Sequence, residues 1–201
     1  LIGAGRTRLL RENFGLATSA HHPDLSPRRS WRNGLGFLSE DRKEEGLMLP
    51  LSLAENTTLT KYATLGRFGW LPPAKLEAAT QPWIARLGIK STGPRQVVGA
   101  LSGGNQQKVA MARLLEHPSE ILLLDEPTRG IDVGSKAQIY QLIAKLAEEG
   151  KAVVLVSSYL PELFGLCDRI AVMRRGAIVD CRVTTDWTEH GLMLAAVGAA
   201  E

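Results

Sequence analysis

Apolar and polar residues follow a regular order in the second half of the chain, from Gly99 onward. Two short apolar runs, 121–124 and 152–156, have the length and composition of buried strands. Between them, apolar residues recur at helical spacing over 135–149, and Gly150 follows where a helix commonly ends. This pattern predicts a strand-helix-strand unit, and therefore a fold of the α/β class.

The remaining segments are predicted from weaker patterns. Residues 170–173 and 178–179 are expected to form two short strands joined by a turn that contains Gly176, and 188–199 can form a helix. In the first half, 19–33 mixes Pro, His and Arg without periodicity and is predicted as a loop. After Pro72-Pro73, the segment 74–87 is expected to be a helix that ends at Gly88. Its predicted apolar side consists of Leu76, Ala79, Trp83, Ala85 and Leu87.

Composition restricts the class of protein. The 201 residues are 44% hydrophobic and 22% charged, which excludes a disordered or fibrous chain and suffices for one large core. The net charge of +3 includes no block of like charges, so nothing supports binding to nucleic acid. The longest uncharged apolar stretch, 191–200, is too short to cross a bilayer. Because the chain starts Leu1-Ile2-Gly3, without Met, we expect a fragment.

Ser102-Gly103-Gly104 precedes a helical run of apolar residues. Two glycines at a helix N-terminus leave backbone N–H groups uncovered at the positive end of the helix dipole, which favours a phosphate. The alternative is an ordinary glycine-rich turn in which Ser102 caps the helix.

Asp125 and Glu126 follow the apolar run 121–124 directly. A carboxylate at the end of a buried strand can hold Mg²⁺ through its oxygens, and a second carboxylate can orient or deprotonate a water that attacks a γ-phosphate. Adjacent residues leaving a strand point to opposite sides, so we assign Asp125 to the metal and Glu126 to catalysis. The alternative is a solvated strand end without function.

Together these segments resemble the ATP-binding-cassette (ABC) ATPases, which are P-loop NTPases with a mixed sheet flanked by helices and a small helical subdomain. The resemblance rests on Leu101-Ser-Gly-Gly, on Leu-Asp-Glu-Pro at 124–127 and on Gly130-Ile-Asp132. The segments 39–47 and 168–173 are also similar to the second cassette of fused double-cassette monosaccharide importers. The resemblance implies one cassette over 1–201, truncated at its N-terminus, with the helical and signature subdomain at about 41–115.

The phosphate loop departs from the family pattern. Gly3, Gly5, Arg6 and Thr7 stand where the loop should end, so Arg6 replaces the usual Lys. Guanidinium is a larger, planar group than ammonium, and we therefore expect a degenerate loop. Thr7 can still contact Mg²⁺ together with Asp125.

Two further positions depart from the pattern. Glu40 stands near the usual Gln, and Ser158 stands where the family has a switch His, so Ser158 occupies a catalytic position without an imidazole. The resemblance also implies nucleotide contacts from Gln106 and Asp132. The segment 15–34 is shorter than expected, and the antiparallel hairpin usual there is expected to be absent.

In the family, ATP lies between the phosphate loop of one cassette and the signature of another. The resemblance therefore implies ATP and Mg²⁺ as cofactors, and the first cassette of the same polypeptide, or a second copy, as partner. It also implies permease subunits, an indirect periplasmic sugar-binding protein, no nucleic acid, and a location at the cytoplasmic face of the bacterial inner membrane. The alternatives are an ABC ATPase that acts on DNA or ribosomes and a non-catalytic interaction module.

Overall fold

The computed structural model describes residues 3–18, 23–66 and 70–198. Its α-helices are α1 (Arg6–Phe14), α2 (Pro27–Arg32), α3 (Leu53–Thr58), α4 (Tyr62–Leu65), α5 (Pro73–Arg86), α6 (Gly103–Glu116), α7 (Val133–Glu148), α8 (Leu160–Leu166) and α9 (Glu189–Val197). Shorter helical segments are η1 (Arg42–Gly46), η2 (Leu59–Lys61), η3 (Val98–Ala100) and η4 (Thr184–Asp186). The strands are β1 (Leu35–Leu38), β2 (Ile121–Asp125), β3 (Ala152–Val156), β4 (Arg169–Arg174) and β5 (Ala177–Val183).

Three strands form a parallel sheet in the order β1-β2-β3. Ile121 at the start of β2 lies opposite Leu35 on one side and Ala152 on the other. The two apolar runs are therefore strands, as predicted, and α7 joins them as the expected crossover helix. The strand β3 is less buried than predicted, since Val154 is 44% exposed. The carboxyl ends of the parallel strands meet at one edge, where Asp125 lies.

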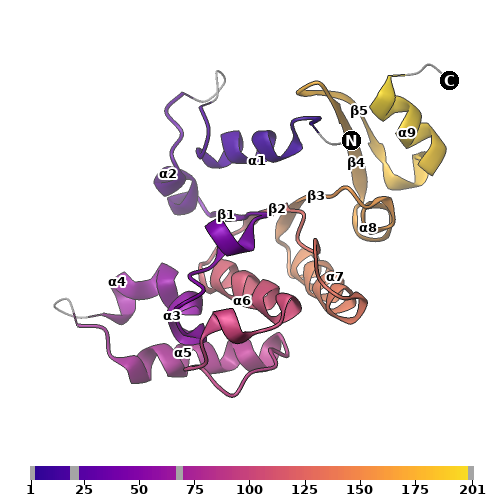
Figure 1. Ribbon diagram of the computed structural model, residues 1–201. Coiled ribbons are helices and arrows are strands. Elements are labelled where there is room, and N and C mark those ends of the chain that lie inside the picture. The colour runs from indigo at the N-terminus through magenta and orange to yellow at the C-terminus, as the bar shows by residue number, and fades with distance from the viewer. Residues whose placement is uncertain (1–2, 19–22, 67–69, 199–201) are drawn as a thin grey trace.

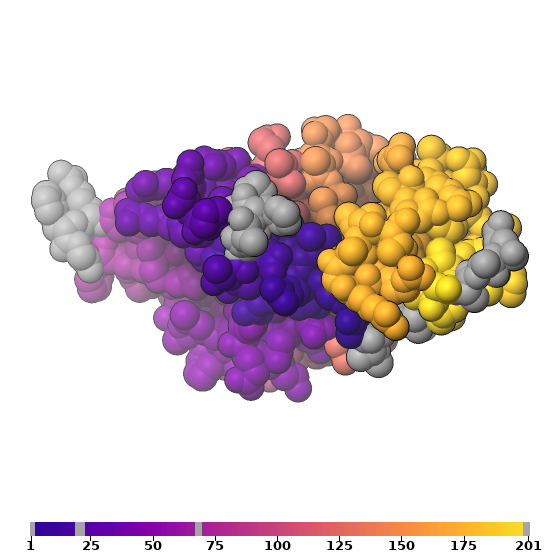
Figure 2. Space-filling view, turned by 90° about the horizontal axis from the view of Figure 1, so that it is seen from above, coloured from indigo at the N-terminus to yellow at the C-terminus, as the bar shows by residue number. Residues whose placement is uncertain are grey.

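Helices cover both faces of this sheet, α1 on one face and α6 with α7 on the other (Figure 1). Successive side chains of β2 enter different cores, because they point to opposite faces of the sheet. Leu122 and Leu124 belong to the large core shared with α6 and α7, whereas Leu123 packs with Leu10 and Phe14 of α1. Viewed from above, α1 lies between α2 and the β4–β5 hairpin (Figure 2).

The predicted C-terminal hairpin is present as the antiparallel pair β4–β5. Arg175 and Gly176 in its turn have φ values of 50° and 83°, which is the left-handed backbone that a tight two-residue hairpin needs. The helix α9 and Trp187 cover its apolar face around Ile170. The sheet predicted as mixed is thus divided into a parallel sheet and a separate antiparallel pair.

Part of the predicted loop 19–33 is helical. Ser26 accepts a hydrogen bond from the Arg29 amide, and Pro27 occupies the first turn of α2, so a Ser-Pro start nucleates the helix. The prediction failed because six residues are too few to show periodicity. Residues 19–22 lie outside the described ranges, and no strand occurs in 15–18 or 23–34.

The predicted helix at 74–87 is α5, but its buried side differs from the prediction. Thr80 is fully buried and Ala85 is exposed. Leu76, Thr80 and Trp83 share one side of a helix by their spacing, whereas Ala85 is turned away from them. A buried Thr hydroxyl was not expected from the apolar pattern.

The helices α3, α4 and α5 lie together beside α6 (Figure 1). This part of the chain falls within the range, about 41–115, for which we predict a helical subdomain. A capping box in which Ser52 and Glu55 bond reciprocally fixes the start of α3. Within the described ranges, the helices are all too short or too polar to pass through a lipid bilayer.

Candidate functional site

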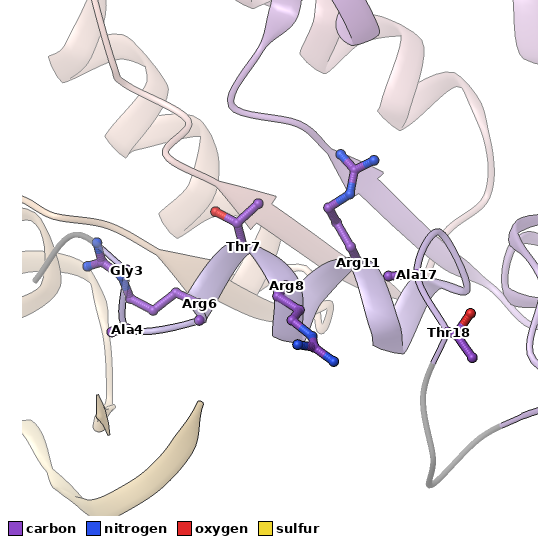
Figure 3. Close-up of a pocket in the computed structure, with 9 residues that line it drawn as sticks. Gly3, Ala4, Arg6, Thr7, Arg8, Arg11, Ala17 and Thr18 are labelled. Atoms are coloured by element: carbon purple, nitrogen blue, oxygen red, sulfur yellow. The ribbon is translucent and has the colours of Figure 1, made fainter. Parts of the chain in front are cut away.

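The predicted phosphate loop leads directly into α1 and borders a pocket of about 670 Å³ (Figure 3). Gly5 has φ 96° and precedes the first residue of α1. A Cβ on Gly5 would lie 3.1 Å from the Gly176 Cα, and the Gly176 amide donates to the Ala4 carbonyl at 3.0 Å. Glycine is thus required at this position, and the β4–β5 turn holds the loop.

Three arginines line this pocket, and each is engaged by another group. Arg8 pairs with Glu12, and Arg11 donates two 2.8 Å hydrogen bonds to the Glu45 carboxylate. Arg6 donates to the Ser157 carbonyl at 2.7 Å. The Arg6 guanidinium is therefore bound to the residue that follows β3. Figure 3 shows that Thr7 and Arg8 leave α1 on opposite sides.

Asp125 is completely buried at the end of β2. Neither of its carboxylate oxygens has a hydrogen-bond partner among the described residues. Burial raises its pKa to about 6, although the nearby Thr7 hydroxyl favours the charged form without completing a hydrogen bond. Two unpaired buried carboxylate oxygens with a hydroxyl beside them suit Mg²⁺, which prefers oxygen ligands.

Glu126 turns away from Asp125 with φ 45°, a conformation that is uncommon for a residue with a side chain. Its carboxylate accepts a hydrogen bond of 3.1 Å from the Ser158 hydroxyl. The Arg6 guanidinium lies 3.9 Å from the other carboxylate oxygen. The structure thus brings together three predicted site residues, Arg6, Glu126 and Ser158.

Sequence reasoning missed Glu162, which is buried in α8. It accepts hydrogen bonds from the hydroxyl groups of Ser157 and Thr128, and burial raises its pKa. Glu162 therefore ties the end of β3 to the loop after β2. No sequence signal marks it, because its partner Thr128 is 34 positions away.

The signature residues form a second cluster at the N-terminus of α6. Ser102 is exposed and caps the helix, since its Oγ accepts from the Asn105 amide at 3.4 Å. Gly103 lies against the guanidinium of Arg42, with Nη2 at 2.9 Å from the place of a Cβ. Gly104 is buried against Ser135, whose Cβ lies 2.7 Å from the place of a Cβ. A further positive charge, that of Arg42, thus accompanies the positive end of α6.

Gly104→Ala is expected to lower the free energy of unfolding by about 1–3 kcal/mol, because the added methyl group would overlap Ser135. Chemical denaturation of the purified chain measures this. Gly165→Ala in α8 is the matched control, because nothing lies within 4 Å of its Cβ position. Equal effects of the two substitutions would contradict the packing role of Gly104.

The structure gives other contacts to two residues predicted to touch nucleotide. Gln106 is buried and its amide donates to the Val98 and Leu101 carbonyls, so it does not reach the surface in this conformation. Asp132 is exposed and caps α7 by accepting from the Ser135 amide at 2.9 Å. That hydrogen bond lowers the pKa of Asp132. Gln106 therefore has a structural role, and Asp132 lies beside Gly104.

Two arginines connect the loop after β1 to the signature cluster at the start of α6. Arg129 pairs with Glu40 at 2.8 Å. Arg42 is another residue that sequence reasoning did not identify. It donates to the Arg129 carbonyl at 3.0 Å and touches Gly103. A displacement of the segment 40–42 would therefore reach the signature residues directly.

The sequence profile described as ABC transporter matches residues 3–129. Ribose import ATP-binding proteins of Rhodococcus jostii and Pseudomonas putida are 40% and 44% identical to the chain, over 99% of its length and 41% of theirs. A galactose/methyl galactoside import ATP-binding protein of Treponema pallidum is 42% identical over 92% of the chain and 40% of its own length. The chain thus spans about two fifths of the length of these relatives.

Two solved structures have the same fold. A nucleotide-free ATP-binding cassette from an ABC transporter has a TM-score of 0.76 at 17% identity, covering 91% of this chain and 78% of that one. A dimeric cassette in a post-hydrolysis state, bound to ADP and phosphate, has a TM-score of 0.74 at 22% identity, covering 90% and 82%. At these identities the likeness concerns the fold alone.

Proposed function

Because the chain belongs to the ABC transporter family of ATP-binding cassettes, we propose that it is the second cassette of a bacterial importer for simple sugars. Its signature would complete an ATP site whose phosphate loop belongs to the partner cassette. The proposal draws on relatives named as ribose and galactose import ATP-binding proteins. Permease subunits would be its membrane partners, at the cytoplasmic face of the inner membrane.

The observation that carries the proposal is the access to the N-terminus of α6. Ser102 is exposed and Gly103 is partly exposed, so a phosphate on another protein surface can approach their backbone amides. Arg42 adds a cation next to Gly103. Gly104 is covered by Ser135, and we therefore assign phosphate contact to Ser102 and Gly103, with Gly104 allowing the close packing.

The chain's own phosphate loop would form a weaker second site. In P-loop proteins a Lys at the position of Arg6 reaches the β- and γ-phosphates. Here the Arg6 guanidinium is held by the Ser157 carbonyl and lies near Glu126. Nucleotide binding at this site has to displace Arg6 or do without it, so we propose slow turnover or none.

When bound, Mg²⁺ would neutralise charge on the phosphates. Asp125 and Thr7 would hold it, because Asp125 has unpaired oxygens beside the Thr7 hydroxyl. Glu126 would orient the attacking water and accept its proton. Ser158 keeps Glu126 in place by a hydrogen bond but supplies no imidazole.

Closure of the two cassettes would be transmitted to the permease through the segment 41–56. The Arg11–Glu45 pair connects this segment to α1, and Arg42 connects it to the signature. Buried Asn56 stabilises its second half by bonding the Met48 amide and carbonyl at 2.8 and 2.9 Å. The segment is therefore attached to both nucleotide-facing clusters.

The experiment compares ATP hydrolysis by this chain, by an intact first cassette, and by their mixture. We expect the mixture to exceed the sum, and Ser102→Arg to reduce the excess at least about tenfold by blocking the γ-phosphate. Thr185→Arg, at an exposed position of η4 outside both clusters, is the control. The composite-site proposal would be contradicted if the mixture hydrolysed ATP no faster than the sum of the two proteins, or if the excess rate persisted with Ser102→Arg.

A separate measurement tests the weak second site. The chain alone should turn over ATP well below the roughly 1–100 s⁻¹ of ordinary kinases. A rate within that range would show that the site with Arg6 is fully active.

A further inference from the structure

A second cavity, of about 270 Å³, lies at the β1 edge of the parallel sheet. It shares no lining residue with the phosphate-loop pocket. Its walls come from α1, α2, β1, η2 and α6, and Figure 1 shows α1 and α6 on opposite sides of β1. It is enclosed from several directions, as small-molecule sites usually are.

Aromatic and aliphatic side chains make up most of its wall. The rings of Phe14 and Phe37 stack with centroids 5.5 Å apart, and the Trp31 ring meets the His117 ring edge-on at 4.8 Å. Burial and the nearby Lys61 lower the pKa of His117, which favours its neutral imidazole. The cavity therefore offers an apolar surface for a flat molecule.

Arg113 of α6 also lines this cavity and is partly buried. Among the described residues, none accepts a hydrogen bond from its guanidinium or forms an ion pair with it. Burial lowers the pKa of Arg113, and no carboxylate in the described ranges opposes this shift. A guanidinium remains charged in proteins, so Arg113 presents a cation to the cavity.

Thr60, on the η2 wall, adds a second unpaired donor. Its hydroxyl is buried and has no hydrogen-bond partner in the described part of the chain. A cation and an unpaired hydroxyl donor on otherwise largely apolar walls suit a ligand that carries a negatively charged acceptor.

We propose that this cavity binds a small organic carboxylate, with an aromatic or similarly flat apolar body among Phe14, Trp31 and Phe37 and its carboxylate on Arg113. A guanidinium matches a carboxylate in geometry, since two parallel N–H groups can donate to its two oxygens. The cavity is smaller than most sites for drug-sized ligands, which favours a molecule with one ring. The site shares no lining residue with the phosphate-loop pocket.

Benzoate and 4-phenylbutyrate are the probes, with benzamide and 4-phenylbutyramide as uncharged counterparts and inorganic phosphate as an anion without an apolar body. Titrations of the whole chain by calorimetry, with NMR shifts to locate the site, measure affinity. We expect at least about tenfold tighter binding of each carboxylate than of its amide, and weak binding of phosphate. Arg113→Gln should abolish this preference, whereas Arg113→Lys should keep part of it.

Arg95→Gln, at an exposed arginine paired with Glu77, is the control and should bind the probes like the original chain. If Arg113→Gln fails to fold, the comparison of acids with amides on the original chain and on Arg113→Lys decides. Equal affinity for acid and amide, retained preference in a folded Arg113→Gln variant, or no binding of either carboxylate would overturn the proposal.

Discussion

At pH 7, Asp125→Asn is expected to raise the free energy of unfolding by about 1–3 kcal/mol and to remove Mg²⁺-dependent nucleotide binding. Asp125 is buried with both oxygens unpaired, so its charge is costly in the empty protein. The same unpaired oxygens are the ones that we propose as magnesium ligands. One substitution therefore stabilises the fold and disables the site.

The pH dependence has a definite sign. The pKa of Asp125 is about 6 in the folded chain against an ordinary value of 3.8, so between these values the folded state holds the extra proton. The original chain accordingly loses stability from this group as pH rises from about 4 to about 6. The advantage of Asp125→Asn should be near zero below that window and complete above it.

Denaturant unfolding at several pH values, without nucleotide, measures this advantage. Titration with ATP, with and without Mg²⁺, measures the loss of function, which we expect to be at least about tenfold in the presence of Mg²⁺. Asp24→Asn, at an exposed position, is the control. A variant that is less stable at pH 7, or that keeps Mg²⁺-dependent binding, would contradict the role assigned to Asp125.

Leu124→Ala should lower the free energy of unfolding by about 2–5 kcal/mol, the range for emptying a well-packed Leu site. Leu124 is completely buried in the central strand, between Leu38 and Leu155 on the neighbouring strands. Removing its side chain leaves a cavity between the sheet and α6, because the strand is paired on both edges and cannot collapse inward.

Ile121→Ala on the same strand is the matched control, since Ile121 is 37% exposed. Its loss should be about 1 kcal/mol. Urea denaturation with an unchanged m-value measures both variants. Similar losses at the two positions would show that the sheet and α6 do not form a common core.

Local patterns were enough for the main elements. The strands β2 and β3 and the helix α7 follow from the spacing of apolar residues within single segments of the chain. The position of Asp125 and Glu126 was also predictable, because a strand end in an α/β fold places side chains at the edge of the sheet where ligands bind. The roles of individual nucleotide-binding residues remain predictions.

The errors occurred where a local pattern was short or incomplete. The helix α2 has six residues, too few for a periodic signal, although Ser26-Pro27 is a typical helix start. The buried side of α5 includes Thr80 in place of Ala85 because helical geometry, and not apolar character, decides which residues face the core.

The sequence by itself determined the family, the parallel strand-helix-strand unit and the kinds of groups available for phosphate and magnesium. Only the tertiary structure decided which groups meet. Arg6 with Ser157, Glu162 with Thr128 and Gly104 with Ser135 are pairs far apart in the chain. Their contacts depend on strand register and on the approach of one helix to another, which no local pattern specifies.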